Sequence, residues 1–227
     1  MEIKSTKDIA ATRITCLVYG PPGIGKTSLA KTVNGGTLII SAESGLLCLA
    51  GSDIDTIEIF TWIDLFALVA FLETEEAKKK YKWIFIDSLT EISQRLLEVL
   101  KKQYIDPKLA LKLWGDYADK MIALIKKFRD MRPYNVVFTA LEKTTQDELN
   151  RRFISIDVAG KTADKIPGLF DLVFKMDFVE DENKTRTRKL ITESGSNFIA
   201  KDRSGKLSTY EEPHLLNIFK KIIKETK

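Results

Sequence analysis

The feature that most constrains this chain is a glycine-rich segment placed between an apolar run and a helical stretch. It reads Gly20-Pro21-Pro22-Gly23-Ile24-Gly25-Lys26-Thr27 and directly follows the apolar residues 14–19. The spacing fits G-x-x-x-x-G-K-[ST], which forms a phosphate-binding loop where a strand leads into a helix. Glycines let backbone N–H groups turn toward phosphate oxygens, and the next helix presents its positive N-terminus to the same anion. The segment therefore predicts a nucleoside triphosphate site.

The side chains of this loop have separate expected tasks. Lys26 is placed to reach the β- and γ-phosphates, and we expect it to lie in a solvated loop. Thr27, the first helical residue, offers a hydroxyl to Mg²⁺, which prefers hard oxygen ligands. Ser28 is expected to be a helix residue that touches phosphate, in a helix 28–33 that stops at Gly35-Gly36. The alternative is a Gly/Pro turn that matches the motif by chance.

Length and composition favour one folded α/β domain covering residues 1–227. With 44% hydrophobic residues, a chain of this length can form a full core without disulfides or metals. Cys16 and Cys48 lack C-x-x-C spacing and stand in apolar surroundings. We therefore expect both to be buried free thiols in a reducing compartment.

Charge and hydropathy argue against several classes of protein. The net charge of +4 is too small to indicate nucleic-acid binding by itself, so such a function must rest on where the charges lie. His214 is the only histidine and has no cysteine neighbour, which argues against a zinc site. No stretch approaches the ~20 apolar residues of a membrane span, and the N-terminus lacks an apolar signal region. We expect a cytoplasmic protein, in the host cytoplasm if a phage encodes it.

Apolar runs alternate with helical periods, which predicts a mostly parallel sheet flanked by helices. Strands are expected at residues 14–19, 37–41, 56–60, 83–86, 135–140, 172–178 and 188–192. Helices are expected at 28–33, at about 62–77, in two periodic stretches at 92–104 and 117–128, and in a closing segment within 213–225. Thr61 and Asp64 have the spacing of a capping box at the start of the second helix. The polar segment 142–165 is long for a plain connection, which indicates a functional loop or a hairpin.

Two acidic residues follow predicted strands and fit the chemistry of a phosphate loop. Asp87 ends the run Trp83–Ile86 and suits an outer carboxylate for Mg²⁺. Glu43 follows the strand 37–41 and is the candidate base that positions water. The alternatives are a helix-capping aspartate and an ordinary exposed loop glutamate.

The order of these motifs resembles the RecA-type ATPase core, and more closely short phage-encoded RecA-like proteins of single-strand annealing and recombination, of the phage AAA type. The resemblance covers nearly the whole chain. It includes the phosphate loop, Glu43, Asp87-Ser88, a segment Gly160-Lys161 to Lys165 before a helix and strand, and Lys201-Asp202-Arg203. It implies that Lys201 and Arg203 are basic residues that reach the nucleotide of the next subunit.

Two departures from the RecA-type pattern limit what the resemblance implies. Leu141 stands about where such recombinases carry a glutamine that senses the γ-phosphate, and Thr139 or Glu142 is the nearby polar residue to take its place. The larger terminal modules of full-length bacterial recombinases have no counterpart here. This favours annealing or an accessory role over complete strand exchange.

The polar segment 142–165 is the predicted contact with single-stranded DNA. Basic side chains would neutralise phosphates and Phe153 could stack on a base, the usual way of holding single strands without reading sequence. The basic residues are Lys143, Arg151, Arg152, Lys161 and Lys165. The alternative is a solvated hairpin, because Asp147, Glu148 and Asp157 lie in the same segment.

The resulting prediction is an ATPase that binds and hydrolyses ATP with Mg²⁺ and acts on single-stranded DNA in phage-type recombination or annealing. The resemblance implies a homo-oligomer with shared active sites, and a single-strand-binding protein is a further expected partner. A small-molecule kinase would use the same phosphate loop but would need an Arg-rich lid and an acceptor pocket. A non-catalytic nucleotide switch is the third possibility.

Overall fold

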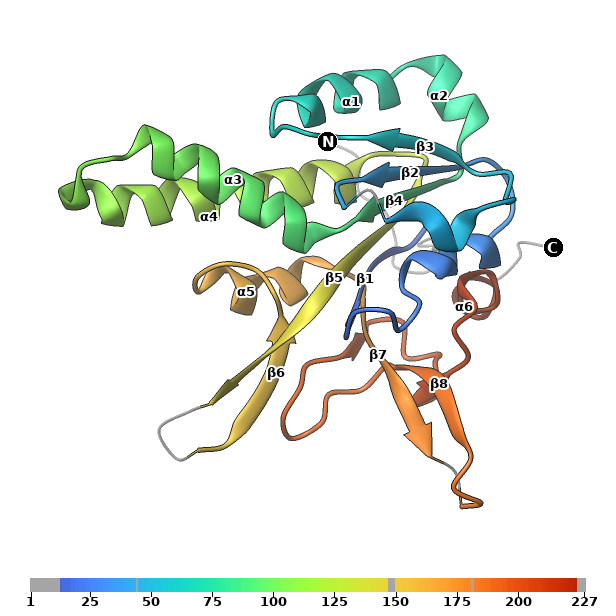
Figure 1. Cartoon of the computed structure of the whole chain (residues 1–227). Coiled ribbons are helices and arrows are strands. Elements are labelled where there is room, and N and C mark those ends of the chain that lie inside the picture. Colours follow the sequence, from blue (N-terminus) through green and yellow to red (C-terminus); the bar gives the residue numbers. More distant parts are fainter. Residues whose placement is uncertain (1–12, 44, 147–149, 181, 224–227) are drawn as a thin grey trace, which may run out of the picture.

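The computed structural model describes residues 13–43, 45–146, 150–180 and 182–223, which form one sheet of ten strands covered by helices (Figure 1). The strands are β1 Thr15–Gly20, β2 Thr37–Ser41, β3 Asp55–Glu58, β4 Trp83–Asp87, β5 Asn135–Gln146, β6 Arg152–Ile156, β7 Leu172–Glu180, β8 Arg186–Ile191, β9 Lys201–Asp202 and β10 Tyr210–Glu211. The main order is β10-β8-β7-β1-β5-β4-β2-β3, with β6 paired to β5 and β9 paired to β7.

The six strands from β7 to β3 in this order run parallel, and β1 lies between β5 and β7. Strands β6, β8, β9 and β10 are antiparallel additions. Parallel strands covered on both faces read as continuous apolar runs, and β1, β2 and β4 are buried along their whole length. The predicted α/β fold with a mostly parallel sheet and a phosphate-loop strand near its centre is confirmed.

Helices cover both faces of the sheet and bury two separate clusters. One face carries α1 Asp64–Leu72, α2 Glu75–Lys80, α3 Leu89–Gln103, α4 Ala110–Asp130 and α5 Thr162–Lys165. The other carries the 3₁₀ helices η2 Thr27–Thr32 and η3 Leu46–Leu49 together with α6 Leu215–Ile222. Two short 3₁₀ helices, η4 Pro107–Leu109 and η5 Ile166–Leu169, precede α4 and β7. The closing helix α6 packs on the sheet through Leu215, Ile218 and Ile222, as expected.

Local signals placed some element boundaries correctly and missed others. The capping box is present, because Asp64 accepts hydrogen bonds from the backbone of Thr61 and donates its own N–H to the Thr61 hydroxyl. The helix expected at 62–77 is instead two helices, since Thr74 caps a second one. The segment expected as helix 28–33 is the 3₁₀ helix Thr27–Thr32.

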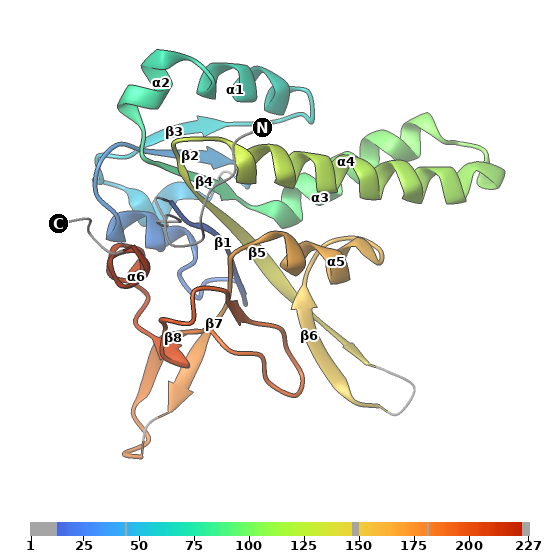
Figure 2. The same ribbon diagram turned by 180° about the vertical axis from the view of Figure 1, so that it is seen from behind.

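The polar segment 142–165 forms a hairpin followed by α5, because β5 continues well past the residues 135–140 expected for it. Glu142–Gln146 pair antiparallel with Arg152–Ile156. This hairpin and the β7–β8 hairpin both extend from the sheet on the side where β1 ends (Figures 1 and 2). Asp147 and Glu148 lie outside the described residues, as do residues 224–225 of the expected closing helix.

Two further expectations concern the cysteines and the membrane. Cys16 is buried, but Cys48 is exposed on η3, so the expectation that both thiols are buried was wrong. The apolar neighbours of Cys48 in sequence did not bury it, because Leu49 is the residue of η3 that turns into the core. Among the described residues, no helix combines the length and apolar character needed to cross a bilayer.

Candidate nucleotide site

The glycine-rich loop begins at the end of β1, where the neighbouring strand leaves room only for glycine. A Cβ atom on Gly20 would lie 2.4 Å from the backbone oxygen of Met176 on β7. Gly25 has φ +103°, a conformation that L side chains rarely adopt. The loop therefore depends on both glycines for its path.

Lys26 lies within the loop, and its ammonium group is held by loop carbonyls. Its Nζ donates hydrogen bonds to the carbonyl oxygens of Gly20 at 3.0 Å and Pro21 at 2.8 Å. The side chain is only 8% exposed, so the expectation of a solvated lysine was wrong. Burial lowers the pKa of Lys26, and the nearby carboxylates of Asp87 and Glu43 oppose this. A buried cation of this kind gains most from a bound anion.

Thr27 and Asp87 meet directly, although 60 residues separate them in sequence. Thr27 begins η2, Asp87 ends β4, and the threonine Oγ1 donates to Asp87 Oδ2 at 2.7 Å. The Thr139 hydroxyl of β5 donates to the other carboxylate oxygen, Oδ1. Asp87 is 5% exposed and is therefore oriented by both neighbours. The hydroxyl and the carboxylate are hard oxygen donors of the type that Mg²⁺ accepts.

Glu43 lies just beyond β2, is exposed, and lies beside Ser88, the residue after Asp87. The Ser88 hydroxyl donates a hydrogen bond to Glu43 Oε1. Arg95 on α3 holds the backbone just before Glu43 in place, because its guanidinium donates hydrogen bonds to the carbonyl oxygens of Ala42 and Ile59. The carboxylate is thus held by one hydroxyl while it stays open to water.

The charges around Lys26 indicate which ligand would fit. The carboxylates of Asp87, Glu43 and Glu142 all act electrostatically on Lys26. Glu142 Oε2 is a buried atom without a hydrogen-bond partner, 3.7 Å from Lys175 Nζ. Three carboxylates would repel a bare polyphosphate, whereas a divalent cation bound with the phosphates would offset that repulsion. The residues present therefore fit a magnesium–nucleotide complex better than a free nucleotide.

A family model for an AAA domain matches residues 12–204 of the chain. The chain belongs to the AAA domain family. Among solved structures it is similar to an ATPase from the type III secretion system of pathogenic bacteria, with a TM-score of 0.51 and 13% sequence identity. The similarity covers 72% of this chain and 51% of that one, so this AAA domain spans about half the length of the secretion ATPase. At this identity the likeness shows the fold alone. No curated protein matches the chain by sequence.

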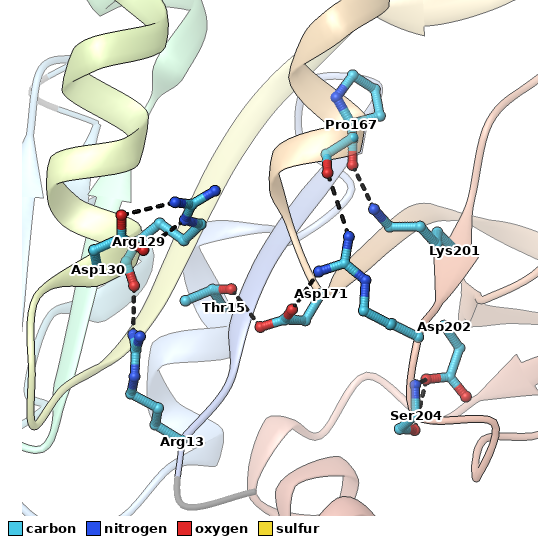
Figure 3. A network of polar contacts seen from close by, with 11 residues as sticks. Arg13, Thr15, Arg129, Asp130, Pro167, Asp171, Lys201, Asp202 and Ser204 are labelled. Atoms are coloured by element: carbon cyan, nitrogen blue, oxygen red, sulfur yellow. Dashed lines mark hydrogen bonds and ion pairs between the residues drawn. The ribbon is translucent and has the colours of Figure 1, made fainter. Parts of the chain in front are cut away.

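Lys201 and Arg203 of this AAA domain lie at the opposite end of the sheet from the phosphate loop. Asp171 accepts hydrogen bonds from Thr15 at the start of β1 and from Arg203, both at 2.8 Å. Lys201 donates to the carbonyl oxygen of Pro167 at 2.8 Å (Figure 3). The length of β1, about 17 Å at 3.3 Å per residue, separates this cluster from Gly20. The two cations therefore do not reach the phosphate loop of their own chain.

The four residues expected to bind DNA are in different situations. Lys143 is half-buried and donates to the carbonyl oxygen of Val158, which takes it away from solvent. Arg151 and Arg152 are exposed near the hairpin tip and, with Phe153, line a hollow of about 390 Å³. Lys161 is exposed at the start of α5, beside Trp114. The structure thus brings Arg151 and Arg152 together but not the other two.

Two residues near the phosphate loop, Arg95 and Lys175, were not expected from the sequence. Arg95 orients the segment that carries Glu43, and Lys175, which is 3% exposed, pairs with Asp177 and faces Glu142. A basic residue inside the otherwise apolar run 172–176 is the signal that could have identified Lys175. Arg95 gave no such signal, because a lysine or arginine in a helix is ordinary.

Proposed function

We propose that this AAA domain is a magnesium-dependent ATP hydrolase of the RecA-like type that acts on single-stranded DNA as a homo-oligomer. The observation that carries the hydrolase proposal is that two hydroxyl groups from different elements, Thr27 of η2 and Thr139 of β5, both donate hydrogen bonds to the carboxylate of Asp87 at the end of β4. Glu43 and its Ser88 hydrogen bond lie next to this group. A loop that only bound phosphate would not need a carboxylate held open to water beside it.

Each residue has a distinct role in this proposal. Lys26 exchanges its carbonyl partners for phosphate oxygens and holds them by charge. Thr27 and Asp87 would hold the metal, and Mg²⁺ would supply positive charge that makes the terminal phosphoryl group easier to attack. Glu43 accepts a proton from the attacking water, while Ser88 fixes the direction of its carboxylate. Thr139 keeps Asp87 in the orientation that faces Thr27.

The β5–β6 hairpin supports the proposal of a DNA ligand. Arg151 and Arg152 are adjacent exposed cations, and Phe153 lies in the same hollow. Cations with a neighbouring aromatic ring are suited to single strands, since every base has a face on which to stack. The hairpin extends on the side of the sheet where the phosphate loop lies, so one face would serve both ligands (Figure 1).

Turnover of ATP, measured with and without single-stranded DNA across a salt series, tests this function. An ATPase that acts on DNA should hydrolyse ATP faster with DNA, and the stimulation should fall as salt rises. Turnover that DNA does not change would remove the DNA half of the proposal. Phosphate transfer to a small acceptor in place of water would indicate a kinase, and binding without turnover would indicate a switch.

Glu43→Gln should retain ATP and hydrolyse it at least about a hundredfold more slowly, because glutamine keeps the size of the side chain but cannot accept the proton. Equilibrium binding of a fluorescent ATP analogue and single-turnover hydrolysis measure the two effects separately. The matched control is Glu58→Gln, an exposed glutamate at the end of the neighbouring strand β3, which should leave both unchanged. If Glu43→Gln hydrolysed ATP at the wild-type rate, Glu43 would be an ordinary loop carboxylate.

Replacing Arg151 and Arg152 together by alanine should weaken single-stranded DNA binding equally for different sequences. The slope of log affinity against log salt should fall by roughly 1 to 2, at about 0.7 per phosphate contact. Fluorescence anisotropy with labelled oligonucleotides measures affinity and slope, and ATP affinity without DNA should stay unchanged. Lys101 and Lys102, adjacent exposed lysines on α3, provide the control pair. An unchanged slope for the arginine pair would show a solvated hairpin.

A further inference from the structure

We propose that Arg188 of β8 is a ligand for the phosphate chain of the nucleotide bound by its own subunit. The inference rests on nucleotide binding at the phosphate loop and adds a contact that the loop motif does not contain. Arg188 is a different cation from Lys201 and Arg203, which lie at the other end of β1 and cannot reach the phosphate loop of their own chain.

The guanidinium of Arg188 lies directly against the phosphate loop. A Cβ atom on Gly25 would lie 2.6 Å from Nη1 and 3.2 Å from Cζ of Arg188. The guanidinium therefore occupies the space next to the residue that precedes Lys26. Any side chain at residue 25 would displace Arg188, which gives this glycine a second reason to be present besides its φ of +103°.

The β7–β8 hairpin holds the arginine in place. Arg188 pairs with Phe178 across the two strands, and its Cζ lies 5.9 Å from the centre of the phenyl ring. Arg186, two residues earlier in β8, lies over the same ring at 4.7 Å. An aromatic ring restricts a guanidinium without neutralising it, because the contact is with the electron-rich face and carries no net charge.

Charge is the reason to assign a ligand to Arg188. The side chain is exposed and contacts the Phe178 ring, and among the described residues no carboxylate forms an ion pair with it. The carboxylates of the site lie around Lys26, on β4, on β5 and just beyond β2, whereas Arg188 approaches the loop from β8. A planar guanidinium binds phosphate oxygens through two parallel hydrogen bonds, which lysine does not reproduce. An unneutralised arginine at the edge of a phosphate loop is thus placed to close over a bound polyphosphate.

Arg186 provides a matched control, since it has the same charge, lies in the same strand and contacts the same ring. Binding of a fluorescent ATP analogue with Mg²⁺ should weaken about tenfold or more in Arg188→Ala, partly recover in Arg188→Lys, and change less than about twofold in Arg186→Ala. Because both positions changed are exposed, thermal unfolding of all three variants should be close to that of the wild-type chain. Binding of a labelled single-stranded oligonucleotide without nucleotide is measured on the same proteins.

The outcomes distinguish this inference from the proposed function. Unchanged nucleotide affinity in Arg188→Ala would overturn the inference while leaving nucleotide binding intact. Equal losses in Arg186→Ala and Arg188→Ala would also overturn it, since the effect would then come from the general charge of the hairpin. A loss of oligonucleotide binding alone would assign Arg188 to DNA instead. A wild-type chain that binds no ATP analogue would overturn the proposed function itself.

Discussion

Replacing Lys26 by alanine is expected to abolish detectable nucleotide binding while the chain remains folded. The ammonium group is the one loop cation buried at the phosphate position, and it makes its two hydrogen bonds to carbonyls of the same loop. Exchange of these neutral partners for phosphate oxygens gives stronger, charge-assisted contacts. Losing two such contacts should reduce affinity by at least about a hundredfold. Equilibrium titration with a fluorescent ATP analogue and Mg²⁺ measures the loss.

The fold should tolerate Lys26→Ala, because the buried lysine charge is itself a cost to the folded chain. Burial lowers the pKa of the lysine, which means that the folded chain already bears a cost for keeping the charged form. Alanine removes that cost and leaves two loop carbonyls, one of them on the half-buried Pro21, to find water. Circular dichroism and thermal unfolding provide the control. A folded Lys26→Ala variant with wild-type affinity would refute the assignment of the phosphate loop.

In the proposed homo-oligomer, replacing Arg203 by alanine should reduce ATP turnover by about a thousandfold or more, the scale of effect when a basic finger is supplied from a neighbouring subunit. Arg203 cannot act on its own phosphate loop, because the full length of β1 separates them. Its ion pair with Asp171 is exposed on both sides, and such pairs contribute little to stability. The arginine is therefore free to exchange Asp171 for a phosphate without a large cost. Steady-state hydrolysis of the assembled protein measures the loss.

Mixing two inactive variants tests whether the finger acts between subunits. Arg203→Ala subunits retain Glu43, and Glu43→Gln subunits retain Arg203, so an interface formed by one of each would contain a complete site. Some turnover should return in the mixture and should rise with the fraction of mixed interfaces. A mixture as inactive as either variant alone, with exchange of subunits shown by fluorescence transfer between labelled chains, would exclude action in trans.

Runs of apolar residues in the sequence predicted the strands of the central sheet well, because the strands of a parallel sheet that is covered on both faces are apolar along their whole length. The runs at 37–41 and 83–86 became β2 and β4 almost residue for residue. The break at Thr74 was missed because the helical period continues through it, while the cap depends on one hydroxyl that accepts from Ala77. Helix and hairpin boundaries rest on such single contacts, which periodicity does not record.

The site could be predicted only where its residues are neighbours in sequence and form a motif. Gly20 to Thr27 could be recognised because eight consecutive positions carry the chemistry. Arg188 and Lys175 reach the same region only through the pairing of β1 with β7 and of β7 with β8. The register that places Arg188 beside the loop joins β1 to β7, more than a hundred residues apart in sequence, and leaves no local trace. Lys26 itself was predicted correctly as a loop residue but wrongly as solvated, because its side chain folds back onto the carbonyl oxygens of Gly20 and Pro21.

Strand β5 has a mechanical consequence. Its inner half lies between β1 and β4 and includes Thr139, which is bonded to Asp87, while its outer end reaches Gln146 at the hairpin. Seven residues of extended chain give an arm of about 23 Å between these points. On such an arm a tilt of about 5° at the inner end displaces the tip by about 2 Å. A movement of the Asp87 carboxylate that tilted this strand would therefore displace the hairpin that carries Arg151 and Arg152 further than it displaced Thr139.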